Sequence, residues 1–220
     1  IIVLDANVLL HIYRLPEAQR SDLMRILKSQ EVLARLWIPH QAALEFHRNR
    51  LKVISDQISS SKKFLDTVDK AFQKLSEEMN GVIREHHPLI DRENWKNKLE
   101  EKLSALTQEY EDVKTRYPVS LEDDPLLNDI LEIMEGRIGD PLSSAEMDEL
   151  RKEAKDRFAK KIPPGYMDEK KKDEERALGD LIFWKQILKK AKEKDSDVLL
   201  VLNDMKEDWW QKIHGHHLPR

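Results

Sequence analysis

The sequence predicts an α/β fold, with a central parallel sheet between layers of helices and a large helical insertion. Three short apolar runs, at residues 1–4, 36–38 and 198–202, support this prediction. Runs that are apolar on both faces are typical of strands buried in a parallel sheet. Helical patterns separate the three runs, and strands that alternate with helices are typical of α/β folds.

The helices beside these strands have recognisable boundaries. The first strand ends at Asp5, and a helix is expected over about 17–28. Pro39 closes the second strand, and a helix begins at His40. An amphipathic helix over about 179–192 precedes the last strand. Together these segments are expected to form a three-layer α/β/α core.

The middle of the chain carries two long apolar stripes with a spacing of three and four residues. The first stripe runs from Leu65 to Val82 and the second from Trp95 to Val113. Such spacing is typical of one face of a long helix. Because residues 86–88 (His-His-Pro) separate the stripes, we expect an antiparallel helical hairpin.

Two shorter helices complete the expected insertion. Ser120 with Asp123 resembles a helix-capping box, and Ser143 with Glu146 forms a second one. The expected division of the single domain, residues 1–220, is an α/β core of 1–52 and 160–212 and a helical insertion of 53–159.

Composition excludes several classes of protein. Of the 220 residues, 40% are hydrophobic and 36% charged, and no apolar run approaches the ~20 residues that a bilayer span needs. The absence of cysteine excludes a disulfide scaffold and a thiolate zinc site, and it fits a reducing cytoplasm. The net charge of −4 gives no global basic signature for nucleic acid. A metal-dependent enzyme remains open, because bound cations invert the local charge.

The ends of the chain carry weaker signals. The chain starts at Ile1 without an initiator Met, and it stops at Arg220 directly after turn residues, so we expect the natural protein to extend past both ends. His214, His216 and His217 are interpreted as a solvated tail rather than as metal ligands.

Four acidic residues are expected to meet at one edge of the sheet. Asp5 ends the first strand and Asp204 follows the last, and the carboxyl ends of parallel strands form the ligand crevice of such sheets. Glu45 lies in the second turn of the helix after the second strand, and Asp180 lies in the first turn of its helix. Taken singly, each could be a helix cap, a turn residue or a solvated charge. Taken together, they suggest Mg²⁺ or Mn²⁺, because hard oxygen ligands suit these ions and crowded carboxylates need a cation.

The segments around these acids resemble the motifs of PIN-domain nucleases. The matching segments, in order, are 2–10 (IVLDANVLL), 43–50 (ALEFHRNR), 179–184 (GDLIFW) and 203–210 (NDMKEDWW). Pro163-Pro164-Gly165-Tyr166 and the pair Trp209-Trp210 are similar to a bacterial subgroup of PIN-like proteins. The resemblance covers residues 1–52 and 160–212, and the insertion contributes little to it.

This resemblance implies a metal-dependent nuclease, usually a ribonuclease, whose four acids hold one or two Mg²⁺ or Mn²⁺ ions. Asn7 would orient a carboxylate or the metal-bound water. The family usually has Thr or Ser where Leu202 stands, so Asp208 becomes a substitute or supporting residue for Asp204. The expected phosphate contacts are Arg48, Arg50 and the run Lys170–Lys172.

RNA is the favoured substrate, with single-stranded or duplex DNA as alternatives. On family resemblance alone, a toxin or a phage-defence effector is the hypothesised role.

Two other functions are compatible with parts of the sequence. A haloacid-dehalogenase-type phosphatase also opens with an apolar strand and an Asp, but it needs a second acid where this chain has Asn7. The other alternative is a catalytically silent interaction module, in which the helical hairpin mediates homo-oligomerisation or binds a partner protein. The presence of all four acids argues against this second alternative.

Overall fold

A three-stranded parallel sheet forms the centre of the fold. The computed structural model describes residues 1–82, 90–116, 120–168 and 177–219. Strand β1 (Ile2–Leu4) lies in the middle, with β2 (Leu36–Trp37) on one side and β3 (Leu199–Val201) on the other. Both neighbours run parallel to β1. The three predicted strands and their parallel arrangement are therefore confirmed.

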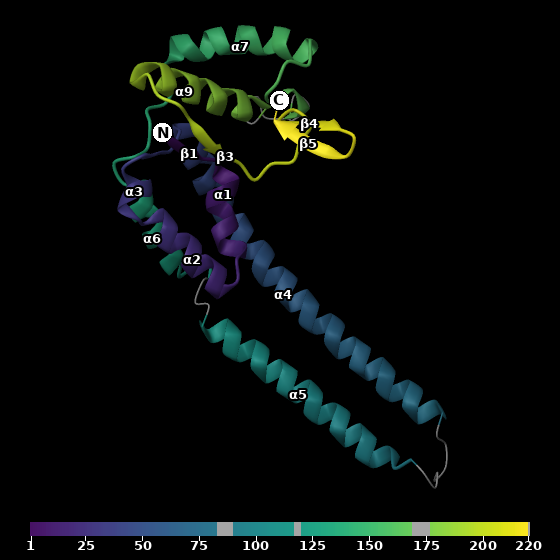
Figure 1. Cartoon of the computed structure of the whole chain (residues 1–220). Helices are drawn as coiled ribbons and strands as arrows, with labels where there is room; N and C mark the ends of the chain where they lie inside the picture. The colour runs from purple at the N-terminus through teal and green to yellow at the C-terminus, as the bar shows by residue number, and fades with distance from the viewer. Residues whose placement is uncertain (83–89, 117–119, 169–176, 220) are drawn as a thin grey trace. The chain divides into compact units, whose positions relative to one another are not determined.

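Helices cover the two faces of this sheet. On one side, α9 (Gly179–Lys194) packs against β3, and α7 (Ser144–Ala159) lies outside α9 (Figure 1). A buried cluster joins these two helices, with Leu150 and Phe158 of α7 against Leu181 and Ile182 of α9. The predicted capping box of Ser143 and Glu146 is present at the start of α7.

The opposite side of the sheet is covered by the helices that follow β1. They are α1 (Ala6–His11), the 3₁₀ turn η1 (Ile12–Arg14), α2 (Glu17–Leu27) and α3 (Gln30–Leu33). Helix α6 (Pro125–Met134) contributes Ile130, Ile133 and Met134 to the core. After it, the chain forms a parallel bridge between Ile138 and Ile38, next to β2.

The chain divides into two compact units. The first comprises residues 1–51 and 126–220, and the second comprises 52–125. Helices α6 and α7, which the sequence analysis assigned to the insertion, thus belong to the first unit. Their apolar stripes resemble those of the hairpin, so periodicity alone could not separate them from it.

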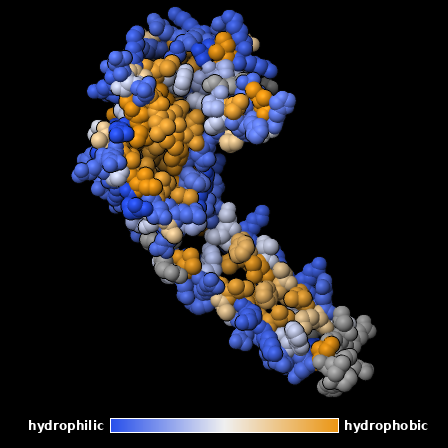
Figure 2. All heavy atoms as spheres, in the orientation of Figure 1, coloured by the Kyte–Doolittle hydropathy of each residue, from blue (hydrophilic) through white to orange (hydrophobic). Residues whose placement is uncertain are grey.

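The second unit consists mainly of two long helices. Helix α4 (His40–Val82) begins in the first unit and continues into the second, and α5 (Arg92–Arg116) runs back in the opposite direction (Figure 1). Figure 2 shows apolar side chains gathered along the middle of this unit. Several apolar side chains of the unit are exposed, since Phe64, Trp95 and Leu106 are all more than half exposed.

A β-hairpin near the end of the chain was not predicted. Strands β4 (Trp210–Ile213) and β5 (His216–Pro219) pair in antiparallel fashion. His214 and Gly215 connect them, and both have positive φ, as a tight hairpin turn requires. The histidines therefore belong to a hairpin rather than to an unstructured tail, and His214 and His216 are exposed to solvent as predicted. Among the described residues, no helix is long and apolar enough to span a membrane.

Candidate metal centre at the carboxyl edge of the sheet

Asp5 lies where β1 passes into α1. Its backbone N–H still donates to the carbonyl of Val201 on β3, at 3.1 Å, so the residue stays in register with the sheet. Burial, and then the charge of Glu45, raise the pKa of Asp5 to about 6, and the charge of Asp180 adds to this. A side-chain hydrogen bond with Asn7 acts in the opposite direction. Asp5 thus faces two other acids at this edge.

Glu45 is held by contacts between α4 and α9. Its Oε1 accepts a 2.7 Å hydrogen bond from the side-chain amide of Gln41, one turn earlier. The buried backbone N–H of Gln41 donates in turn to Oε1 of Gln186 on α9, at 3.0 Å. A Cβ at Gly179 would lie only 2.6 Å from Oε1 of Glu45, so glycine at the start of α9 leaves room for this carboxylate.

Asp180 occupies the first turn of α9, where the helix dipole favours an ionised carboxylate. Burial raises its pKa, and the charge of Lys206 lowers it. The charges of Asp168 and Asp208 raise the pKa of Asp180 further. Asp180 therefore interacts with Asp5 on one side and with a second group of charges on the other.

Lys206 is the centre of this second group. Its Nζ lies 3.0 Å from Oδ2 of Asp168, 3.2 Å from Oδ2 of Asp180 and 3.2 Å from Oδ2 of Asp204. Burial opposes the charged form of Lys206, but the carboxylates of Asp180, Asp168 and Asp204 raise its pKa well above the usual value. Asp204 is fixed as well, because its Oδ1 accepts a 2.8 Å hydrogen bond from the backbone N–H of Lys206.

Asp208 fixes the loop that carries Asp168. Its side chain is only 1% exposed, and Oδ2 accepts hydrogen bonds from the backbone N–H groups of Gly165, at 3.0 Å, and Met167, at 3.3 Å. Gly165 has a φ of +98° and packs against Asp180, an arrangement that glycine adopts without strain. Asp208 thus supports the site through the loop.

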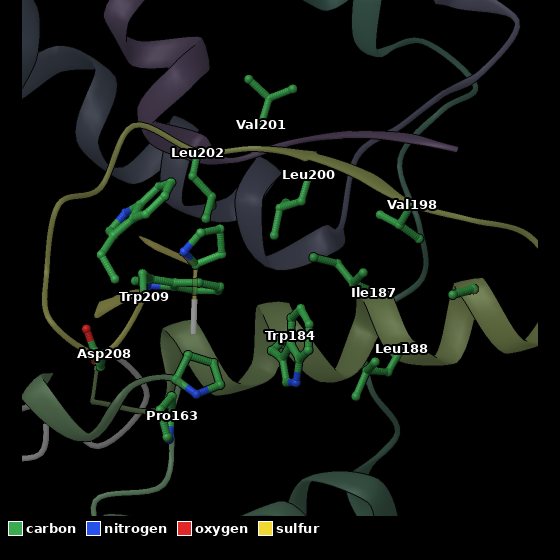
Figure 3. A pocket seen from close by; sticks show the side chains of 14 residues that line it. Pro163, Trp184, Ile187, Leu188, Val198, Leu200, Val201, Leu202, Asp208 and Trp209 are labelled. Atoms are coloured by element: carbon green, nitrogen blue, oxygen red, sulfur yellow. The ribbon is translucent and has the colours of Figure 1, made fainter. Parts of the chain in front are cut away.

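The segment after Asp208 packs onto α9. The ring of Trp209 meets the rings of Phe183 and Trp184 edge to face, each at 6.3 Å. An apolar cavity of about 690 Å³ lies beside it, and Leu200 of β3 and Leu202, just after this strand, point into it (Figure 3). Trp210 donates from its indole N–H to the carbonyl of Asp204. The tryptophan pair therefore anchors the segment that carries Asp204 and Lys206.

A family model for the PIN-like domain matches residues 1–220, the whole length of the chain. The chain belongs to the PIN-like domain family. No curated protein and no solved structure matched it. PIN-like domains are in general metal-dependent nucleases that act on nucleic acids and use divalent cations.

The donor set of this PIN-like domain fits such a cation in its chemistry. Asp5, Glu45 and Asp180 supply only hard carboxylate oxygens, and the pKa of Asp5 is raised first by burial and then by the charges of Glu45 and Asp180. Among the described residues, no three acidic or histidine side chains are placed to hold one ion as they stand.

The sequence-predicted residues of the PIN-like domain lie in several places. Asp5, Glu45 and Asp180 influence one another electrostatically, and Asp204 joins them through Lys206. Arg48 is exposed on α4 and Arg50 is half-buried one turn beyond Glu45. The predicted phosphate contacts Lys170 and Lys172 fall in 169–176, outside the described residues.

Sequence reasoning missed Asp168 and Lys206. Asp168 ends the short 3₁₀ turn η2 (Tyr166–Asp168) and Lys206 lies in an irregular segment, so neither belongs to an element long enough to show a periodicity. The position of Lys206 two residues from Asp204 and from Asp208 was the one available signal, because a cation between two acids often pairs with them. Gln41 and Gln186 also escaped notice, because uncharged amides on helices do not stand out in a sequence.

Proposed function

We propose that this PIN-like domain is a metal-dependent nuclease that hydrolyses phosphodiester bonds. The observation that carries the proposal is the gathering of Asp5, Glu45 and Asp180 at the carboxyl edge of a parallel sheet, with charges that disfavour one another. A divalent cation relieves such crowding. The membership of the chain in a family of nucleases supports the same activity.

In this proposal Asp5, Glu45, Asp180 and Asp204 hold one or two Mg²⁺ or Mn²⁺ ions. When bound, these ions supply an activated water for in-line attack at phosphorus and stabilise the leaving oxygen. Asn7 orients the carboxylate of Asp5, with which it shares a hydrogen bond.

The proposed contacts with nucleic acid are four basic residues. Arg48 and Arg50 follow Glu45 on α4, and Lys170 and Lys172 lie outside the described residues. Basic side chains of this kind bind backbone phosphates. RNA is the substrate we favour, with single-stranded and duplex DNA as the other candidates. We further propose a cytoplasmic role as a toxin or as an effector of defence against phage.

A second candidate function rests on the second unit. Several large apolar side chains on α4 and α5 are strongly exposed there, namely Phe64, Leu75, Trp95, Leu106 and Val113. An exposed apolar stripe is a common feature of protein–protein contacts. In this alternative the chain acts as an interaction or self-association module and does not cleave nucleic acid.

A cleavage assay separates the two functions. The full chain is incubated with Mg²⁺ or Mn²⁺ and with single-stranded RNA, single-stranded DNA or duplex DNA. We expect cleavage that EDTA abolishes and that Asp5→Asn lowers by at least ~100-fold, since even supporting residues of metal sites cost about 10- to 100-fold.

The matched control for this assay is Asp156→Asn, which removes an exposed carboxylate on α7 that pairs with Lys160 one helical turn away. It should cleave like the wild type. A folded protein that cleaves none of the three polymers and self-associates with rising concentration would favour the interaction module.

A further inference from the structure

The ammonium group of Lys206 occupies a point where three carboxylates converge. Asp168, Asp180 and Asp204 each place an oxygen within 3.0 to 3.2 Å of its Nζ. Two of these contacts, to Asp168 and Asp180, are hydrogen bonds, and the third, to Asp204, is an ion pair. All three hold the ammonium against carboxylate oxygens. Its contacts are those of a cation that neutralises a cluster of acids.

The backbone holds Lys206 in this position. Its N–H donates to Oδ1 of Asp204 at 2.8 Å, and its carbonyl accepts from the N–H groups of Trp209 and Trp210, each at 3.1 Å. The next acid along the chain, Asp208, is buried and tied to the loop of Asp168. The fold thus holds both Lys206 and the loop of Asp168 in place before any ligand binds.

The other half of the site has a different electrostatic character. Around Asp5, the two neighbouring side chains that add charge are Glu45 and Asp180, and both are negative. Asp180 lies between the group around Lys206 and the group around Asp5. Its Oδ2 contacts the Nζ of Lys206, and its negative charge raises the pKa of Asp5. A divalent cation bound by Asp5, Glu45 and Asp180 would therefore share the carboxylate of Asp180 with Lys206.

We infer that Lys206 takes the place of a second metal ion, so that this PIN-like domain binds one divalent cation, at Asp5, Glu45 and Asp180. The inference rests on the proposed metal-dependent function and refines it. A second ion at Asp168, Asp180 and Asp204 would have to displace an ammonium that already satisfies the same oxygens. Asp204 then acts as a positioning residue that holds Lys206, and it does not bind the metal itself.

The number of Mn²⁺ ions bound per chain tests this inference without any measurement of activity. Isothermal titration calorimetry and Mn²⁺ electron paramagnetic resonance are applied to the full chain in the absence of nucleic acid. We expect one ion for the wild type and two for Lys206→Met, which keeps the length of the side chain but removes its charge. The double variant Lys206→Met/Asp168→Asn should return to one ion, because the vacated position loses a ligand.

The matched control is Lys189→Met, which removes a lysine of α9 that pairs with Glu146 at 2.7 Å on the surface. It should bind one ion, as the wild type does. If Lys206→Met does not fold, Lys206→Gln takes its place, and the wild-type stoichiometry can still contradict the inference.

Three results would overturn the inference. Two ions in the wild type, or one ion in a folded Lys206→Met, would contradict it and leave the proposed nuclease intact. A wild type that binds no Mn²⁺ would instead remove the metal site of the proposed function, and the inference with it.

Discussion

At the scale of single residues, Asp5 carries the clearest consequence for pH. Its pKa is about 6 in the folded protein, against 3.8 for an unperturbed group, mainly because of burial and then the charge of Glu45. A folded state that binds a proton more tightly than the unfolded state loses stability as the pH rises. Without metal, this loss should develop between about pH 4 and pH 6 and persist above that range.

Asp5→Asn should therefore stabilise the metal-free protein at pH 7.5, by at most about 3 kcal/mol, because the amide cannot ionise. The gain should shrink at pH 4, where the wild-type carboxyl is protonated in the folded state. Urea unfolding in EDTA at the two pH values measures this. Asp156→Asn, which removes an exposed carboxylate of α7, serves as the control. An Asp5→Asn protein that is equally destabilised at both pH values would contradict the prediction.

The four acids could be predicted from sequence because each has a local marker. Asp5 and Asp204 follow apolar strands, and Glu45 and Asp180 lie early in helices. Asp168 has no such marker, and its contact with Lys206 joins residues 38 positions apart. Only the folding of the Gly165 loop onto α9 brings these two together.

At the scale of elements, the start of α9 sets the position of Glu45. The carboxylate of Glu45 can lie close to Gly179 because glycine has no side chain. Gly179→Ala would place a methyl group 2.6 Å from the present position of Oε1, and the end of the Glu45 side chain would have to move. We expect the fold to persist and the affinity for Mn²⁺ to fall by about tenfold or more, as for other displaced supporting contacts.

Calorimetric titration of Gly179→Ala with Mn²⁺ measures this loss. The control is Gly81→Ala on α4, because a Cβ at that position meets nothing within 4 Å. Replacing a helical glycine with alanine should leave Mn²⁺ affinity unchanged and stabilise the helix by up to about 1 kcal/mol. Equal Mn²⁺ affinity in both variants would show that Glu45 does not depend on Gly179.

The strands and helices of the core were predicted to within a few residues, because their apolar patterns are unambiguous. The hairpin of β4 and β5 was not, since its turn uses His214 with a positive φ, where Asn or Asp is the usual signal. Its strands also contain many polar residues, so alternation of apolar and polar residues is weak.

At the scale of the whole molecule, the division into two units limits what metal binding can stabilise. All of the candidate ligands lie in the first unit, residues 1–51 and 126–220. The sequence predicted a core and an insertion but placed the second boundary at 159, because the helices before that point share one periodicity. Tertiary packing, through Ile130 and Leu150 among others, assigns α6 and α7 to the first unit.

Mn²⁺ should therefore raise the melting temperature of the first unit. A ligand at 100 times its dissociation constant stabilises the folded state by about 2.7 kcal/mol. Tryptophan fluorescence reports on this unit, because every tryptophan except Trp95 lies in it. The double variant Asp5→Asn/Glu45→Gln should show no shift with Mn²⁺. A shift of the same size in this variant would place the ion elsewhere.

The most direct test of the central claim is anomalous diffraction from a crystal of the full chain grown with Mn²⁺. We expect a strong anomalous peak between Asp5, Glu45 and Asp180, at about 2.0–2.3 Å from their carboxylate oxygens. We also expect the Nζ of Lys206 to remain beside Asp168 and Asp204. The absence of a peak at these acids, with Mn²⁺ ordered elsewhere or nowhere, would contradict the assignment of this edge of the sheet as the metal centre.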